Sequence, residues 1–475
     1  MAALTTTLYV ILLILVILTL FNIIIFVHEL GHFLAAKWRG LQVDRFQIWF
    51  GKPIWKKEFR GVQYGLGWIP AGGFVALPQM APMEAIEGGP DEGETRPPLP
   101  PISATDKIIV AFAGPLFSML LALSCAFIVT QVGKPRDFMP ETRLGYVHPG
   151  SPADQAGMRA GDRILEINGQ PVDGFQGTLD SIFERIVLSR GDEIRFTVER
   201  PGEAAPLTLT TGFEREDTRW FQRSGLREVG IAPAGDVVIG EIMKNSPAEK
   251  AGIVPGDQLV SADGIELFSI SQLSAHMRAR DWQPLELVVK SPTDGLLRTV
   301  TLTPESPIQP EGEPPMIGVR WDPGQQVDTR IVYPGAYEQV KDSLRMMWVT
   351  LSSLVASDSS VGVDQLAGPV GIAKIQYQLL QTEDGWRRVL AFMVLFNVNL
   401  AVLNMLPFPV LDGGHITLAV LEKIARRPVR ARPLELIQTV CALALISLML
   451  YITSKDIGDG FGRGGGSTPS IEFGE

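Results

Sequence analysis

Apolar positions along the chain gather in four long runs that each have the length of a membrane-spanning helix. The runs are Leu8–Val27, Ile108–Thr130, Val389–Leu411 and Leu436–Thr453. A helix needs about 20 predominantly apolar residues to cross the hydrocarbon core of a bilayer. The first run has no basic segment before it and no small-residue cleavage site after it, so we interpret it as a retained helix and not as a signal peptide. The pattern predicts four membrane crossings.

Lysine and arginine residues are concentrated in the two segments that follow the first and the third apolar run. Examples are Lys56 and Lys57 after the first run, and Arg426 and Arg427 after the third. Short loops rich in Lys and Arg stay in the cytoplasm, so both segments are predicted to be cytoplasmic. Both termini and the long segment 131–388 are then expected on the other side of the membrane.

The external segment contains a sequence repeat. The stretch "SPADQAGMRAGDRILEINGQPV" from Ser151 matches "SPAEKAGIVPGDQLVSADGIEL" from Ser246 at an offset of 95 residues, and alternating strand patterns follow each copy. This period is too long for a solenoid unit and fits two copies of a small α/β domain, at 135–218 and 228–306. The pattern resembles bacterial PDZ domains. That resemblance implies binding of extended peptides or free C-termini by strand addition; the alternative is that the two domains act only as bulky screens.

Two further stretches have a distinct composition. The segment 336–355 predicts an amphipathic helix at the membrane surface; the alternative is a simple connector. Residues 79–101 are rich in Pro, Gly and acidic residues and predict a disordered loop, and the glycine-rich tail 458–475 predicts a flexible end.

Composition and charge narrow the classes of partner. Hydrophobic residues make up 46% of the chain, the formal net charge is −10 and the pI is near 5.2. With no basic stripe on the soluble segments, we expect no nucleic-acid partner. The two cysteines, Cys125 and Cys441, each lie within an apolar run, which argues against a disulfide framework.

The first apolar run continues directly into His28-Glu29-Leu30-Gly31-His32, an H-E-x-x-H motif. On a helix, residues four apart share a face, so His28 and His32 can reach one metal ion while Glu29 lies beside them as an acid or base. Ionisable groups inside a membrane are costly and mark functional sites. The alternative is a pair of buried histidines bonded to neighbouring carbonyl groups.

A catalytic zinc site needs a third protein ligand and one open position. His148 and His276 fall in the external domains, on the wrong side of the membrane. The stretch "NMLPFPVLDGGH" at the end of the third apolar run offers Asp412 and His415. Apolar runs of similar length precede His28 and Asp412, and both helices run in the same direction, so the two residues are expected at similar depth. This favours Asp412 over His415; the alternative is that Asp412 is a helix-end carboxylate facing water.

These motifs resemble the site-2 protease family of intramembrane metalloproteases. HELGH in a first membrane helix, "NMLPFPVLDGG" in a third and two external PDZ-like copies occur in the family's order, and the resemblance covers nearly the whole chain. Within the family, the proteases that regulate sigma-E in Gram-negative bacteria are most similar. The resemblance implies one Zn²⁺ per chain, with His28, His32 and Asp412 as ligands and Glu29 as the catalytic acid and base.

The resemblance also carries three finer implications. Asn399 and Asn404 match asparagines that hold the substrate backbone in the family; the alternative is that they make packing contacts between helices. Residues 62–77, "VQYGLGWIPAGGFVAL", resemble a membrane re-entrant β-hairpin whose edge pairs with an extended substrate, or else form a cytoplasmic hairpin resting on the membrane. The family often has Ala-Gly-Pro-x-x-Asn in the second helix, but this chain has Ser118 in place of the asparagine.

The sequence therefore predicts a multi-pass α-helical membrane protein with four transmembrane helices, a membrane-associated β-hairpin and two tandem external PDZ-like α/β domains. The expected transmembrane helices are 1–36, 105–131, 388–415 and 434–454, with HExxH in the first and LDGG in the third. The cytoplasmic segment with the hairpin is 37–104, the PDZ-like domains are 135–218 and 228–306, the membrane-surface segment is 333–387 and the flexible tail is 458–475.

The expected function is intramembrane zinc endopeptidase activity on transmembrane segments of single-pass membrane proteins. By resemblance, the substrates include an anti-sigma factor already trimmed outside and remnants of signal peptides. The protein is expected in the bacterial inner membrane, with the PDZ-like domains and both termini periplasmic and the active site near the cytoplasmic side. The alternative is a non-enzymatic PDZ scaffold that binds peptides and holds a structural metal, whose site would close with four protein ligands.

Overall fold

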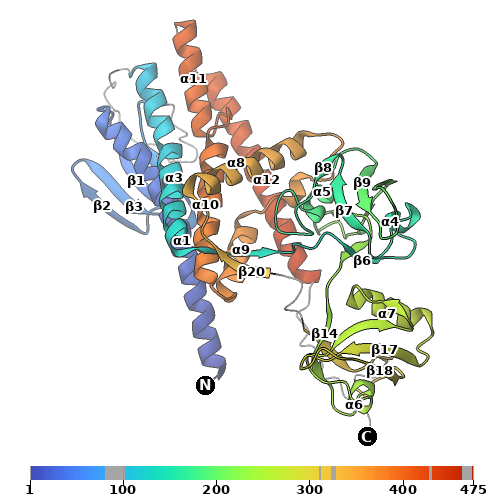
Figure 1. Ribbon diagram of the computed structural model, residues 1–475. Coiled ribbons are helices and arrows are strands. Elements are labelled where there is room, and N and C mark those ends of the chain that lie inside the picture. Colours follow the sequence, from blue (N-terminus) through green and yellow to red (C-terminus); the bar gives the residue numbers. More distant parts are fainter. Residues whose placement is uncertain are drawn as a thin grey trace. The chain divides into compact units, whose positions relative to one another are not determined.

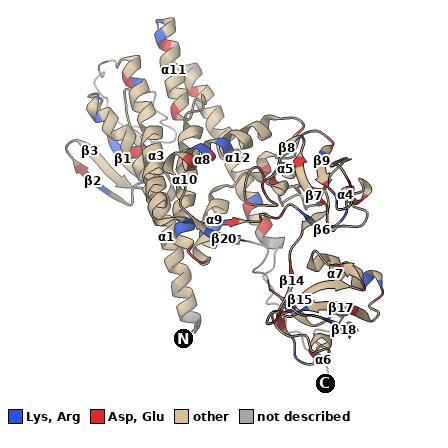
Figure 2. Ribbon diagram, viewed as in Figure 1, with Lys and Arg blue, Asp and Glu red and all other residues tan. Residues whose placement is uncertain are grey.

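Four long apolar helices dominate the membrane part of the chain (Figure 1). The computed structural model describes residues 2–80, 100, 102–309, 312–322, 328–426, 431–462 and 473. Within these residues, the helices that are long and apolar enough to cross a membrane are α1 (Ala2–Trp38), α3 (Ala104–Val132), α10 (Gly385–Asn404) and α12 (Ala431–Gly462). Figure 2 shows α1 free of charged residues along most of its length. The prediction of four apolar helices is confirmed.

The chain divides into two compact units. The first comprises residues 1–135, 331–349 and 367–457, and the second comprises residues 136–330, 350–366 and 458–475. In the first unit, α3 packs against α1, α10 and a further helix, α11 (Asp412–Ala425). A Cβ atom on Gly31 of α1 would lie 2.3 Å from the carbonyl oxygen of Ala113 in α3. A glycine is therefore required where these two helices cross, as is common for close helix contacts in membranes.

The third apolar helix ends earlier than predicted. α10 stops at Asn404 instead of continuing through 415, and Asp412 opens the separate helix α11. Pro407 and Pro409 lie between the two helices, and proline cannot continue a helix because it lacks an N–H and clashes with the preceding turn. A Cβ on Gly414 would lie 2.0 Å from the carbonyl oxygen of Phe408, so this glycine lets the proline loop fold tightly against the start of α11.

Residues 45–76 of the first unit form a four-stranded sheet in the order β2-β3-β1-β4. The strands are β1 (Arg45–Phe50), β2 (Trp55–Phe59), β3 (Val62–Leu66) and β4 (Ile69–Ala76). The predicted hairpin at 62–77 is therefore wrong in its pairing. β3 pairs with β1 in parallel and β4 pairs with β1 antiparallel, so β1 lies between the two strands that were expected to pair. β4 is left as an edge strand of this sheet.

The two sequence copies in the second unit share one order of elements. The first copy contains β6 (Leu144–Val147), α4 (Pro152–Gln155), β7 (Arg163–Ile167), β8 (Gln170–Pro171), α5 (Ile182–Val187), β9 (Ile194–Glu199), β10 (Leu207–Thr211) and β13 (Ile231–Pro233). The second contains β14 (Val237–Ile242), α6 (Pro247–Lys250), β15 (Gln258–Ala262), β16 (Ile265–Glu266), α7 (Ile270–Ala279), β17 (Leu285–Lys290), β18 (Leu297–Leu302) and β19 (Val319–Trp321).

Each copy extends beyond its predicted end because a late strand completes it. β13 pairs with β6 in the first copy, and β19 pairs with β14 in the second. Short strands also form β11 (Glu214–Arg215) with β12 (Arg227–Glu228), and β5 (Lys134–Phe138) with β20 (Asp328–Val332). Residues 310, 311 and 323–327 lie outside the described residues.

The repeated motif has a local physical basis. Ser151 caps a one-turn helix by accepting the N–H of Asp154, with proline at the first helical position. The aspartate of the later Gly-Asp pair, Asp162, is 1% exposed and binds Arg200 at 2.7 Å. The second copy repeats the serine cap, and its buried Asp257 pairs with Arg298.

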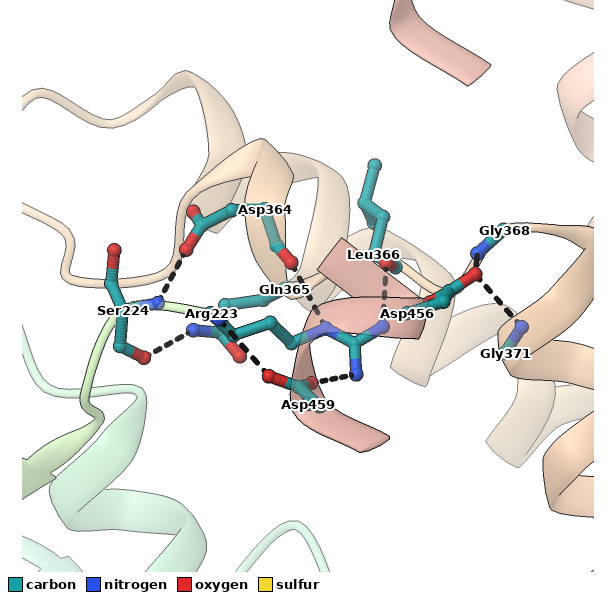
Figure 3. Close-up of polar contacts among 9 residues, drawn as sticks. All are labelled: Arg223, Ser224, Asp364, Gln365, Leu366, Gly368, Gly371, Asp456 and Asp459. Carbon is teal, nitrogen blue, oxygen red and sulfur yellow. Dashed lines mark hydrogen bonds and ion pairs between the residues drawn. The ribbon is translucent and has the colours of Figure 1, made fainter. Parts of the chain in front are cut away.

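The amphipathic helix predicted at 336–355 is present as α8 (Ala336–Val355), followed by a 3-10 turn, η2 (Val363–Gln365), and by α9 (Pro369–Gln381). The N-terminus of α9 receives a carboxylate from α12. Asp456 accepts the N–H groups of Gly368 and Gly371 at 3.1 and 2.8 Å, and both contacts are buried (Figure 3). A Cβ on Gly371 would lie 2.5 Å from Asp456 Oδ1, so these glycines allow the carboxylate to approach the helix end.

The last turns of α12 remain helical to Gly462, although a flexible tail was predicted from 458. Within the second unit, Arg223 donates to Asp459 at 2.9 Å and to the carbonyl oxygens of Asp364 and Leu366 (Figure 3). This arginine therefore binds the end of α12 to the η2 turn. Most of the loop predicted at 79–101 and of the tail lies outside the described residues, apart from Phe473.

The contact between Asp456 and α9 leads to a stability prediction. Asp456→Ala leaves two buried N–H groups without an acceptor, which costs about 1–3 kcal/mol per group. We expect the melting temperature of the detergent-purified chain to fall, with a smaller fall for Asp456→Asn, which keeps an acceptor oxygen. Ser454→Ala, an exposed position on the same helix, is the control. Equal melting temperatures for Asp456→Ala and Ser454→Ala would contradict the assignment.

Candidate metal centre

Three side chains from two distant segments meet in the first unit. His28 and His32 lie one turn apart on α1, and Asp412 lies in the first turn of α11. His28 Nε2 lies 3.4 Å from His32 Nε2 and 3.3 Å from Asp412 Oδ2, and His32 Nε2 lies 3.3 Å from Asp412 Oδ1. One ligand atom from each of the three residues falls within 4.8 Å of the others. The structure thus brings the three sequence-predicted ligands together.

These separations fit a tetrahedral zinc ion. With Zn–N and Zn–O bonds of about 2.0–2.2 Å, ligand atoms at the corners of a tetrahedron lie about 3.4 Å apart. Asp412 Oδ2 is buried and has no hydrogen-bond donor among the described residues, despite its distance of 3.3 Å from His28 Nε2. A buried carboxylate oxygen without a donor needs a cation. The donor set of two imidazoles and one carboxylate leaves one position open, as in catalytic zinc sites.

The other ring nitrogens of both histidines are held by α3. His32 Nδ1 lies 2.8 Å from the carbonyl oxygen of Val110, which can only accept, so Nδ1 carries the proton and Nε2 presents its lone pair to the cluster. His28 Nδ1 lies 3.0 Å from the hydroxyl of Ser118, which is fully buried. Such partners orient metal-binding imidazoles. Ser118 therefore contacts the ring of His28 from α3.

The stretch "AGPLFS" of α3 makes a second contribution to the cluster, which was not predicted from the sequence. A Cβ on Gly114 would lie 2.2 Å from His32 Nε2, so the ring of His32 packs on backbone that must lack a side chain. The signal was present in "AGPLFS", since a glycine in the interior of a spanning helix indicates a close approach. Its partner could not be identified from the sequence alone.

A cavity of about 400 Å³ opens beside the cluster. Its lining includes Glu29, Asn404 and His415 together with residues of β4. Glu29 lies against β4, because a Cβ on Gly73 would lie 3.2 Å from the Cγ of Glu29. The cavity therefore joins the three ligands, an acidic side chain and the edge strand of the sheet.

The remaining sequence candidates lie at different distances from the cluster. Asn404 Nδ2 is 3.4 Å from His28 Nε2, whereas Asn399 is absent from the cavity lining and its Oδ1 is buried without a partner among the described residues. His415 lines the cavity but does not belong to the three-residue cluster. His276, in the second unit, binds Asp263 at 2.7 Å.

Comparison with known proteins places these features in context. The model of peptidase family M50 matches residues 15–448. A protein of Ralstonia nicotianae whose name places it with the zinc metalloproteases is 29% identical over 457 residues, covering 90% of this chain and 95% of that protein. Protease RseP of Yersinia pestis is 28% identical over 450 residues, covering 90% and 94%. The regulator of sigma-E protease RseP of Salmonella typhimurium is 27% identical over 445 residues, again covering 90% and 94%.

The ligand set predicts the behaviour of two neighbouring variants. Asp412→Asn replaces an anionic ligand with a neutral amide, and we expect the zinc content of the purified chain to fall to a small fraction of the wild-type value. His415→Ala alters the same helix and the same cavity but should retain zinc. Metal analysis of both proteins after dialysis checks this. Zinc loss from His415→Ala with retention in Asp412→Asn would move the third ligand to His415.

The contact between His28 and Ser118 predicts a graded effect. Ser118→Ala removes the group that orients the His28 ring, and we expect a loss of zinc affinity of about 10–100-fold, measured by competition with a chelating dye. Ser124→Ala is the matched control, because Ser124 lies on the same helix but is exposed. If both variants bind zinc as tightly as the wild type, the hydroxyl of Ser118 does not support the site.

Proposed function

Because this chain belongs to peptidase family M50 and is a membrane-embedded zinc metalloprotease, we propose that it cleaves transmembrane segments of single-pass membrane proteins. In this proposal His28, His32 and Asp412 hold the zinc ion, one per chain, and Glu29 is the catalytic acid and base. One observation carries it. The three ligand atoms converge beside a cavity that also exposes Glu29, on a helix apolar enough to span a membrane.

The protein groups around the cavity divide the chemical work. When bound, zinc supplies Lewis acidity toward the scissile carbonyl group and toward the attacking water. Glu29 takes a proton from that water and delivers it to the nitrogen of the leaving amine. The buried contacts to Val110 and Ser118 hold the imidazoles in place, so no rotation of the ligands is needed during the reaction.

Substrate backbone needs new hydrogen-bond partners when it leaves its helix, because unpaired peptide groups are costly in lipid. The unpaired edge of β4 supplies them in our proposal, since Gly72, Gly73 and Phe74 of this edge strand line the cavity. An extended substrate segment added to β4 would pass the metal site. Asn404 would then bind a substrate carbonyl. Asn399 is a packing residue in this proposal, because it does not line the cavity.

The wider setting follows the family resemblance. We propose that the protein lies in a bacterial inner membrane, with both β-rich copies and both termini periplasmic and the metal site near the cytoplasmic side. The proposed substrates are single-pass proteins already trimmed outside, such as an anti-sigma factor, and remnants of signal peptides. The two β-rich copies are PDZ-like domains that select substrates, either by binding peptides or by excluding large external parts. The sheet at 45–76 is proposed to re-enter the membrane.

The non-enzymatic scaffold is the weaker candidate. It required a structural site closed by four protein ligands, with His415 as the fourth. Among the described residues, the cluster has three members and His415 is not one of them. Family membership also favours the enzyme.

The role of Glu29 predicts a loss of cleavage without loss of metal. We expect Glu29→Gln to cut a tagged single-pass substrate in membranes about 10²–10⁴-fold more slowly, because the acid and base group is missing. Its zinc content should equal that of the wild type. Glu58→Gln, on the exposed strand β2, is the control and should cleave normally. Cleavage by Glu29→Gln at the wild-type rate would sink the mechanism.

A further inference from the structure

Phe473 is buried in the second unit, far along the sequence from the residues it contacts. Its side chain is only 7% exposed. Two atoms of its ring, Cε2 and Cζ, lie 2.9 and 3.0 Å from the point that a Cβ on Gly318 would occupy. Gly318 immediately precedes β19, the edge strand of the sheet in the second β-rich copy. The ring thus lies against the backbone corner at which this edge strand begins.

The two β-rich copies share this corner but differ in what covers it. Gly230 before β13 and Gly318 before β19 both have positive φ, +81° and +75°. A Cβ on either would touch the serine of the Ser-Pro-Ala motif, Ser151 at 2.3 Å or Ser246 at 2.2 Å. In the first copy the next neighbour is His148, at 3.5 Å. In the second copy the next neighbours belong to Phe473. Among the described residues, an aromatic side chain from a distant part of the sequence therefore covers this corner in the second copy and not in the first.

The surroundings of the ring fit a peptide with an aromatic residue next to acidic ones. A pocket beside it is lined by the end of β14, by the turn Met243–Asn245 and by Arg320 of β19. Ile242 contributes apolar surface and Lys244 contributes positive charge, while Arg320 is paired with Glu241, which also lines the pocket, at 2.8 Å. In the sequence, Glu472 and Glu475 flank Phe473. An edge strand beside a partly apolar pocket is the arrangement that binds extended peptides by strand addition.

We propose that the second β-rich copy carries a binding site for an acidic peptide segment with a central aromatic residue, and that the chain's own Phe473 side chain occupies it. An external peptide must displace this side chain. A ligand tethered in the same chain reaches effective concentrations of about 1 mM, so a free peptide competes at a disadvantage. This proposal rests on the peptide-binding role proposed above for that copy and does not depend on proteolysis.

The test is peptide binding to the full-length chain in detergent micelles. The probe is a fluorescein-labelled peptide with the sequence of residues 467–475, STPSIEFGE, followed by fluorescence anisotropy. With an effective concentration near 1 mM and an intrinsic Kd of about 10–100 μM, Phe473→Ala should bind the probe about 10–100-fold more tightly than the wild type. Phe461→Ala, which removes the same type of side chain near the end of α12, should match the wild type.

The sequence repeat provides a matched control for the location of the site. In the Phe473→Ala background, Ile242→Ala should weaken probe binding about tenfold, because apolar contact with the ring is lost. Val147→Ala, the equivalent position 95 residues earlier, should leave it unchanged. A probe in which alanine replaces the phenylalanine should bind more weakly to every variant.

Three results would overturn the proposal. The first is equal binding of the probe to the wild type and to Phe473→Ala. The second is weakening by Val147→Ala as strong as that by Ile242→Ala, which would place the site elsewhere. The third is wild-type affinity for the probe that rises as the protein is diluted, which would make a second copy of the chain the source of Phe473. Cleavage of a membrane substrate is not measured in any of these experiments, so their failure would leave the proposed protease function standing.

Discussion

Two imidazoles and a carboxylate buried among apolar helices must satisfy one another, and the rest of the membrane unit depends on this constraint. Each group alone is expensive in a low-dielectric surrounding. At separations of 3.3–3.4 Å, His28, His32 and Asp412 are spaced to share one cation. Two helices that are far apart in the sequence, α1 and α11, must therefore place these groups at one depth and hold them there. The function follows from the same requirement, because a three-ligand site leaves a position open for chemistry.

Helix α3 makes most of the contacts that fix the two histidine rings. Ser118 and the carbonyl group of Val110 fix the two rings, while Gly114 lets the ring of His32 lie directly on the helix backbone. Gly31 brings α1 close enough for these contacts. On the other side, the proline loop after α10 turns the chain so that Asp412 starts a new helix and faces the histidines. Small and cyclic residues thus determine the geometry, and the ligands supply the chemistry.

Much of the fold and of the metal cluster was predictable, because local sequence patterns indicate these features strongly. Hydropathy predicted the four apolar helices, and the spacing of HELGH together with apolar runs of similar length indicated Asp412 as the residue that joins the two histidines. The repeat also indicated two similar β-rich copies. Pairing was harder, because strand patterns do not identify partners, and β1 lies between the two strands expected to form a hairpin. The end of α10 was misplaced because the apolar run masked Pro407 and Pro409. The contacts of Ser118, Gly114 and Phe473 could not be predicted, because their partners lie far away in the sequence and no local pattern identifies them.

X-ray absorption at the zinc edge of the purified full-length chain tests the central claim most directly. Coordination by His28, His32 and Asp412 predicts a first shell of nitrogen and oxygen atoms at about 2.0–2.2 Å, with the outer-shell scattering of two imidazole rings and no sulfur at about 2.3 Å. Replacement of His28 and His32 by alanine should abolish that spectrum along with the bound zinc. A sulfur shell, or an unchanged imidazole signal in the double variant, would place the metal elsewhere and contradict the assignment.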